Sequence, residues 1–299
     1  MAISATMVRD LREKTNAGMM DCKRALEETG GDFEKAIDWL RAKGLSAAAK
    51  KSGRVASEGA VFAQSNGKTG ALVEINSETD FVARNDGFKN FVKAIADHAM
   101  TNPEGEIMKQ KLVSGRLVED ELKEKIATIG ENLVIRRTKR YDLQGTGYIH
   151  TYVHGEGKIG VMVEVAGTDK PELRTFAQDV CLHIAAMNPM AISADQMPAD
   201  VVAKEKEVLR AKNIEQGKKP EMIDKIVEGQ IRKFLAESCL LDQAFVKNPD
   251  LKVGDYAKET GKKVGSDVAV KRFVRFELGE GIEKKVEDFA AEVAAQMKN

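Results

Sequence analysis

The chain has 299 residues, of which 42% are hydrophobic and 31% charged, so it has the composition of a globular protein with room for two or more domains. Lysine plus arginine equals aspartate plus glutamate, at 47 each, which excludes a net positive field that would hold nucleic acid or an anionic membrane by charge alone. Charged residues within the first ten positions interrupt any signal-peptide core, and no apolar run reaches the length of a membrane helix. A cytoplasmic protein without a membrane partner is expected.

Three short amphipathic patterns separated by glycine-containing breaks make up residues 1–44. The first follows Ser4 and Thr6, which can cap a helix, the second starts at Asp21, and the third runs from Phe33 to Gly44. Their apolar core would be marginal alone. A small helical head is therefore expected, followed by a basic, glycine-bounded linker at residues 49–59.

The middle of the chain contains an internal duplication. Matching segments recur at shifts of 90, 85 and 135 residues: GALVEI (70–75) with GVMVEV (160–165), FVKAIADH (91–98) with FAQDVCLH (176–183), and GENLVIRRTKRYDL (130–143) with GSDVAVKRFVRFEL (265–278). Each copy shows a hairpin of alternating strands, a helix, a further short helix and a third strand. The predicted class is α+β, with an antiparallel sheet backed by helices that is present twice.

The differences between the three shifts locate the residues that one copy has and the other lacks. Between the second strand and the helix, copy one is longer by 5 residues, which fall in the polar stretch EINSETDFVARND at 74–86. This stretch carries one large apolar side chain, Phe81. Because copy two forms the same unit without these residues, packing does not require them, and recognition is the expected reason for their presence.

Copy two is longer by 50 residues between its helix and third strand. Two amphipathic patterns joined by QGKKP predict an antiparallel helical hairpin at about residues 190–247. Two interpretations stay open, because the hairpin can pack on its own domain or can project as an arm for a partner or a second copy of the chain.

The expected organisation is a helical head and linker at 1–54, core copy one at 55–145, core copy two with the inserted hairpin at 146–281, and a C-terminal helix at 282–299. In the last segment, Ile282, Val286, Phe289 and Val293 share one helical face. This helix can cover its own core or dock on a partner, and self-packing is slightly favoured.

Several patterns that suggest catalysis or cofactors have simpler explanations. GEGKIG (155–160) and GKT (67–69) fall in hairpin turns between strands, where a nucleotide-binding loop would need a following helix, so no cofactor is expected. His150 and His154 share a strand face but lack a third metal ligand. His98 and His183 occupy the same place in both copies, which favours a role in helix packing.

The cysteines do not indicate a disulfide framework or a zinc site. Cys22, Cys181 and Cys239 are odd in number and far apart, and no C-x-x-C is present. We therefore expect all three to be small apolar core residues.

The third strand of each copy is basic: Arg136, Arg137 and Arg140 correspond to Lys271, Arg272 and Arg275. Because both copies carry these charges, solubilising an exposed strand face or edge is the simpler explanation. One tryptophan and four tyrosines also offer few platforms on which bases could stack. No direct contact with nucleic acid is expected.

Two long segments resemble the signatures of a known family. LREKTNAGMMDCKRAL (11–26) and EINSETDFVAR (74–84) are similar to those of the bacterial translation elongation factor Ts family, and the similarity extends over nearly the whole chain. The resemblance implies a UBA-like head, no cofactor and no covalent chemistry. It implies a guanine nucleotide exchange factor that binds elongation factor Tu, a GTPase, and promotes release of GDP by disturbing its Mg²⁺ and phosphate site.

The resemblance also implies the residues that contact the GTPase. These are Thr79, Asp80, Phe81 and Val82 in the polar stretch, Met19 and Met20 in the head, and His154 as a weaker candidate. From the residues alone, two other classes stay open. A small-molecule enzyme would need convergent titratable groups, which the sequence does not show at recognisable spacing. A structural dimer would be built on the helical hairpin and would leave Phe81 unexplained.

Overall fold

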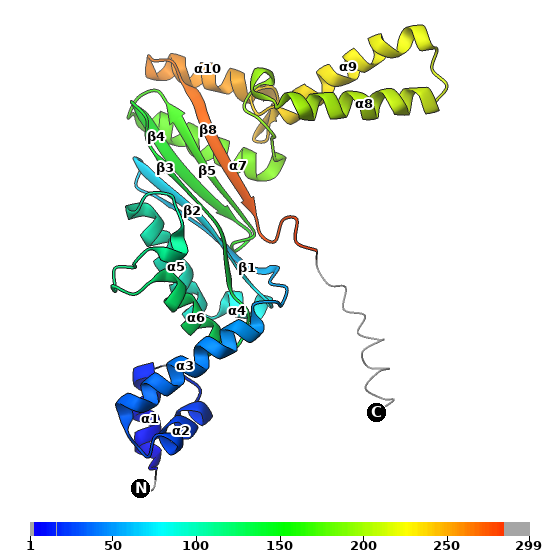
Figure 1. Cartoon of the computed structure of the whole chain (residues 1–299). Coiled ribbons are helices and arrows are strands. Elements are labelled where there is room, and N and C mark those ends of the chain that lie inside the picture. The colour runs from blue at the N-terminus through cyan, green and yellow to red at the C-terminus, as the bar shows by residue number, and fades with distance from the viewer. Residues whose placement is uncertain (1–2, 16, 284–299) are drawn as a thin grey trace.

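The three parts of the molecule lie along its length in a computed structural model that describes residues 3–15 and 17–283. A three-helix head lies at one end, two three-stranded antiparallel sheets lie in the middle, and a helical hairpin lies at the other end (Figure 1). The predicted α+β class is confirmed. Nearly all of the expected C-terminal helix, with Val286, Phe289 and Val293, lies outside the described residues.

The head consists of α1 (Ala5–Thr15), α2 (Met19–Glu28) and α3 (Phe33–Lys51). Ser4, not Thr6, caps α1, because its Oγ accepts a hydrogen bond from the Met7 backbone N–H at 3.2 Å. α3 continues past Gly44, where the sequence predicted its end, into the first residues of the expected linker. A Cβ on Gly44 would lie only 3.0 Å from the Ala127 Cβ on α6 (Val118–Ile129), so this glycine allows two helices to approach closely rather than ending one.

Each core copy is an antiparallel sheet with helices on one face. The strand order is β1 (Glu58–Ser65), β2 (Thr69–Ser77), β3 (Val134–Asp142) in copy one and β4 (Gly147–His154), β5 (Ile159–Ala166), β8 (Ala269–Glu277) in copy two. The covering helices are α5 (Asp86–Thr101) and α6 in copy one, and α7 (Pro171–Met187) and α10 (Val253–Val264) in copy two. The order of elements therefore repeats, as the shifted segments predict.

The other faces of the two sheets pack against each other. Their shared core consists of Val61, Leu72, Tyr141, Ile149, Met162 and Phe276. The glycine that opens each repeated strand segment allows this contact, because a Cβ on Gly70 would lie 2.7 Å from Ile149 Cγ2 and one on Gly160 would lie 2.4 Å from Val61 Cγ1. The repeated glycines thus belong to the interface between the copies.

The basic third strands are edge strands of their sheets, as one of the two expected explanations has it, but three of their arginines pair with buried carboxylates. A β-bulge in the pairing of β2 with β3 lets two successive residues, Arg136 and Arg137, face the fully buried Glu74. The distances are 2.9 Å from Arg136 Nη1 to Oε1 and 2.5 Å from Arg137 Nε to Oε2. In copy two, Arg272 Nε lies 2.7 Å from Oε2 of the buried Glu164. A buried carboxylate needs a cationic partner, and these arginines supply it.

The two predicted insertions are present as helices. The 5-residue excess of copy one corresponds to α4 (Asp80–Arg84), which is a helix and not the loop that its polar composition suggested. The excess of copy two contains α8 (Ala199–Glu215) and α9 (Pro220–Ser238), which project from the core as an antiparallel hairpin (Figure 1). Short elements complete the fold: η1 (Ile107–Lys109), η2 (Ala194–Gln196), β6 (Ala244–Phe245) and β7 (Asn248–Lys252).

The cysteines and the paired histidines are core residues. All three cysteines are free and buried, as predicted. His98 and His183 are buried at matching places, and their Nε2 atoms lie 2.6 and 2.9 Å from the Oε1 atoms of Gln110 and Gln243. Each histidine thus joins its helix to a following connecting segment, and its matching, buried place in both copies agrees with the prediction of a structural role. Within the described part of the chain, no helix has the length and hydrophobicity to span a membrane.

Candidate partner-binding site

Phe81 is presented by α4, the short helix between β2 and α5. Its neighbour Val82 is only 8% exposed and packs in the core of copy one, whereas the Phe81 side chain is 77% exposed. Burial of a phenylalanine is favourable by about 1.5–3 kcal/mol, so folding alone gives no reason to expose this ring. Val82 therefore anchors the helix, and Phe81 is left for contact with another molecule.

The residues before Phe81 are fixed by hydrogen bonds. Thr79 is the N-cap of α4, and its hydroxyl and backbone N–H donate to the carboxylate of Glu131 at 2.6 and 2.9 Å. Ser77 Oγ donates to the Thr79 carbonyl at 2.9 Å. Asp80 forms an exposed ion pair with Arg84, one turn later, at 3.4 Å. Sequence reasoning missed Glu131, because it is 52 residues away from its partner, and its place in the repeated segment 130–143 does not indicate that contact.

The two methionines of the head lie in the first turn of α2. The helix begins at Met19, two residues before the predicted start at Asp21, and the Met19 and Met20 side chains are 57% and 67% exposed. Gly18 and Asp21 on either side of them line a groove of about 640 Å³ between the head and α6. The methionines thus lie in the chain segment that forms one wall of this groove.

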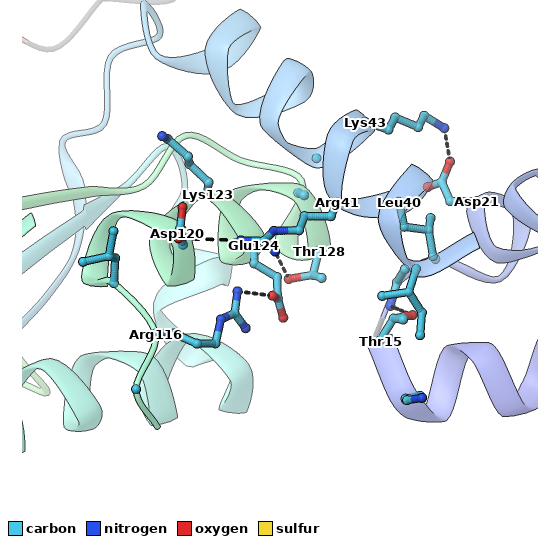
Figure 2. Close-up of a pocket in the computed structure, with 18 residues that line it drawn as sticks. Thr15, Asp21, Leu40, Arg41, Lys43, Arg116, Asp120, Lys123, Glu124 and Thr128 are labelled. Carbon is cyan, nitrogen blue, oxygen red and sulfur yellow. Dashed lines mark hydrogen bonds and ion pairs between the residues drawn. The ribbon is translucent and has the colours of Figure 1, made fainter. Parts of the chain in front are cut away.

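The groove has both apolar and charged lining residues, and Figure 2 labels Leu40 among the former and the members of three ion pairs among the latter. Its apolar lining residues include Ile37 and Leu40 of α3 and Ala127 of α6. Three ion pairs line the sides: Arg41 with Asp120 at 3.7 Å, Arg116 with Glu124 at 2.6 Å, and Lys43 with Asp21 at 2.5 Å. Such a groove suits one amphipathic helix of a partner. It could not be predicted, because its two walls are far apart in the sequence.

His154 lies at the exposed end of β4, where its Nδ1 is 2.9 Å from the Tyr152 hydroxyl. The turn that follows reaches the first sheet, because the Gly157 carbonyl accepts a hydrogen bond from the Val61 N–H at 2.8 Å. The seven predicted contact residues therefore lie on three separate elements. Thr79, Asp80, Phe81 and Val82 form one continuous group, and Met19 and Met20 form an adjacent pair.

A family model described as elongation factor TS matches residues 78–280. The chain belongs to the elongation factor Ts family. Proteins named elongation factor Ts from Bdellovibrio bacteriovorus, Trichlorobacter lovleyi and Symbiobacterium thermophilum are 66%, 48% and 46% identical to it. The matches cover 100%, 99% and 98% of this chain, and 99%, 98% and 98% of those proteins.

As a member of the elongation factor Ts family, the protein is a translation elongation factor. The family model begins at Glu78, directly before Thr79, and includes α4, Glu131 and His154. Met19 and Met20 precede that match but fall within the full-length similarity to the Bdellovibrio protein. The resemblance noted from the two sequence segments is thus confirmed.

Proposed function

We propose that this elongation factor Ts family member is a guanine nucleotide exchange factor that binds elongation factor Tu and promotes the release of GDP. The observation that carries the proposal is the exposed ring of Phe81 on a helix anchored by the buried Val82. Exchange of this kind takes place in the cytoplasm. It requires neither a cofactor nor the making or breaking of a covalent bond.

The proposed mechanism is an exchange of one ligand for another. A GTPase holds GDP through a phosphate-binding loop and Mg²⁺, whose near-octahedral coordination tolerates little distortion. A protein that binds the GTPase better when this site is disturbed must weaken GDP binding by the same free energy. Phe81 enters the partner as a wedge that displaces the elements around the metal. Asp80, which is half exposed beside it, competes for hydrogen bonds there.

The energy of one ring limits what the wedge does alone. Burial of a phenylalanine contributes about 1.5–3 kcal/mol, and each tenfold increase in release rate requires about 1.4 kcal/mol. Phe81 therefore accounts for about one or two orders of magnitude. Any larger acceleration must draw on binding energy from the rest of the interface.

The head supplies part of that binding energy in this proposal. Met19 and Met20 are flexible, polarizable side chains that adapt to a partner surface. They are exposed in the segment that forms one wall of the groove, whose apolar and charged lining residues suit a helix of the GTPase. His154, on copy two, is a third and weaker contact.

The direct test is a measurement of nucleotide release. Elongation factor Tu is loaded with fluorescent GDP, unlabelled GDP is added in excess, and the fluorescence decay is followed at increasing concentrations of this protein. We expect the release rate to rise and then saturate, and we expect chromatography to show unaltered GDP. A release rate that stays at its spontaneous value at every concentration would contradict the proposal.

A further inference from the structure

Two glutamates, Glu78 and Glu131, join the start of α4 to the segment after α6. The Glu131 carboxylate accepts hydrogen bonds from the Thr79 hydroxyl and backbone N–H at 2.6 and 2.9 Å. In return, the Glu78 carboxylate accepts one from the Asn132 backbone N–H at 2.6 Å. Asn132 Nδ2 also donates to the Arg54 carbonyl at 2.7 Å. Each segment therefore provides a carboxylate for the backbone of the other.

α4 needs such support because it is very short. A helix of five residues has little intrinsic stability, since the first turn fixes several residues for few hydrogen bonds. At an N-cap, a threonine hydroxyl usually accepts a hydrogen bond from the helix backbone. Here the Thr79 hydroxyl donates to Glu131 instead, and the Thr79 side chain accepts no hydrogen bond from the backbone of α4. The carboxylate also places a negative charge near the positive end of the helix.

The second core copy provides an internal comparison. At the shift that relates the third strands, Glu131 and Asn132 correspond to Ser266 and Asp267. Copy two passes from β5 to α7 without a helix equivalent to α4. The glutamate is thus present in the copy that has the short helix and is replaced by serine in the copy that lacks it.

We propose that Glu131 is a positioning residue for nucleotide exchange. Through Thr79, its carboxylate fixes the direction of α4, so that Phe81 already points outward before the GTPase arrives. Without this contact, α4 samples other orientations, and only a fraction of complexes insert the ring. This inference rests on the proposed exchange activity and assigns to it a residue that does not itself contact the partner.

The kinetic test uses the full chain with Glu131→Ala and Glu131→Gln in the fluorescent GDP assay. Glu131→Ala is expected to lower the maximal release rate about tenfold, in line with the loss of two charge-assisted hydrogen bonds, and to leave the half-saturating concentration unchanged. Glu131→Gln keeps one acceptor oxygen and is expected to fall between Glu131→Ala and wild type. A partly unfolded variant would instead raise the half-saturating concentration and keep the maximal rate.

A double variant shows whether Glu131 acts through Phe81. Glu131→Ala combined with Phe81→Ala is expected to exchange no more slowly than Phe81→Ala alone, because the positioned ring is already absent. The matched control is Ser266→Ala, at the corresponding place in copy two, which is expected to keep the wild-type rate. A wild-type rate for Glu131→Ala, or a fully additive loss in the double variant, overturns the inference.

A readout without the GTPase separates this inference from the proposed function. Chymotrypsin cleaves after exposed phenylalanine when the local backbone opens. Cleavage after Phe81 is expected to be several-fold faster in Glu131→Ala, and in Thr79→Val if the first variant folds poorly. Equal cleavage rates in wild type and both variants overturn the positioning role. A wild-type protein that releases no GDP contradicts only the proposed function.

Discussion

At the scale of single residues, Phe81 and Val82 are adjacent but are expected to have opposite roles. Phe81→Ala removes an exposed ring, so the free energy of unfolding is expected to change by less than about 0.5 kcal/mol. Because the ring is the proposed wedge, maximal GDP release is expected to slow by about one to two orders of magnitude. Denaturant unfolding and the fluorescent GDP assay measure the two quantities.

Val82→Ala is the matched control for that prediction. Val82 is buried in the core of copy one, so its truncation is expected to lower the free energy of unfolding by about 2 kcal/mol. Loss of stability in Phe81→Ala comparable to that of Val82→Ala would mean that the ring packs on its own domain. Normal exchange by Phe81→Ala would mean that it is not the wedge.

Glu74 gives a prediction about pH. Burial alone would raise the pKa of its carboxyl, but the hydrogen bond from the Gly279 backbone N–H and the contacts with Arg136 and Arg137 outweigh burial and hold the pKa below its ordinary value of 4.5. Because the pKa is lowered in the folded state, this carboxylate stabilises the fold above about pH 4.5. The contribution is lost as the pH falls through the folded-state pKa.

Glu74→Gln is therefore expected to lower the free energy of unfolding by about 2–3 kcal/mol at pH 7, because it leaves the two arginines without their buried partner. Below pH 4.5 the difference from wild type is expected to shrink. Denaturant unfolding at a series of pH values provides the test. The exposed Glu237→Gln serves as control, and its effect should stay within about 0.5 kcal/mol. A difference independent of pH argues against the assigned ionisation.

At the scale of elements, long periodic segments could be predicted from the sequence, and short or long-range features could not. The strands, the larger helices and the hairpin follow from apolar spacing, and the changes in shift located both insertions. α4 is too short for its periodicity to be seen. The Arg136 pairing depends on a β-bulge, and the groove beside α6 depends on packing between distant segments. Neither the bulge nor this packing produces a pattern in the local sequence.

The candidate site shows the same division. Phe81 could be singled out because the duplication shows that packing does not require its segment. Glu131 has an ordinary sequence context, and only the three-dimensional structure brings it to Thr79. The exposed candidate residue Phe81 was therefore predictable from the sequence, whereas Glu131, which contacts the N-cap of its helix, was not.

The helical hairpin is expected to be separable from the rest of the fold. Its middle part packs on itself, through Ile223, Val227 and Ile231 with side chains of α8. Replacement of residues 205–230 by a short Gly-Ser linker is therefore expected to leave the unfolding of the core nearly unchanged. A loss of core stability above about 2 kcal/mol would show that the hairpin supports the core.

The same truncation tests the prediction of a homodimer. Val208, Ile214 and Met222 are exposed apolar side chains on the hairpin. If they mediate self-association, light scattering of the full chain at high concentration gives the mass of a dimer, and the truncated chain gives that of a monomer. A monomer in both cases contradicts the dimer interpretation and leaves the proposed exchange activity unaffected.

At the scale of the whole molecule, the fold places the two proposed roles, binding of the GTPase and disturbance of its nucleotide site, on separate elements. The two sheets pack through a shared core, which joins copy one to copy two. The head is joined to this core by α3, which packs on α6 and lines the groove. In the proposed mechanism, contacts made by the head contribute to holding the GTPase, while α4 directs the Phe81 ring at the nucleotide site.

This separation predicts how two sets of substitutions combine. Met19→Ala with Met20→Ala removes apolar contacts from the head alone, so the half-saturating concentration is expected to rise about ten- to hundredfold, with little change in the maximal release rate. Phe81→Ala is expected to lower the maximal release rate, with little change in the half-saturating concentration. Because the two groups lie on separate elements, the losses in transition-state free energy are expected to add in the triple variant.

Met190→Ala is the matched control, since Met190 is similarly exposed but belongs to copy two, outside the proposed contacts. It is expected to leave both kinetic parameters at their wild-type values. If the methionine pair instead lowered the maximal rate and left the half-saturating concentration unchanged, the head would take part in displacing GDP. If the triple variant lost no more transition-state free energy than Phe81→Ala or the methionine double variant, the head and α4 would act as one unit. The effects of independent sites add, whereas those of coupled sites do not.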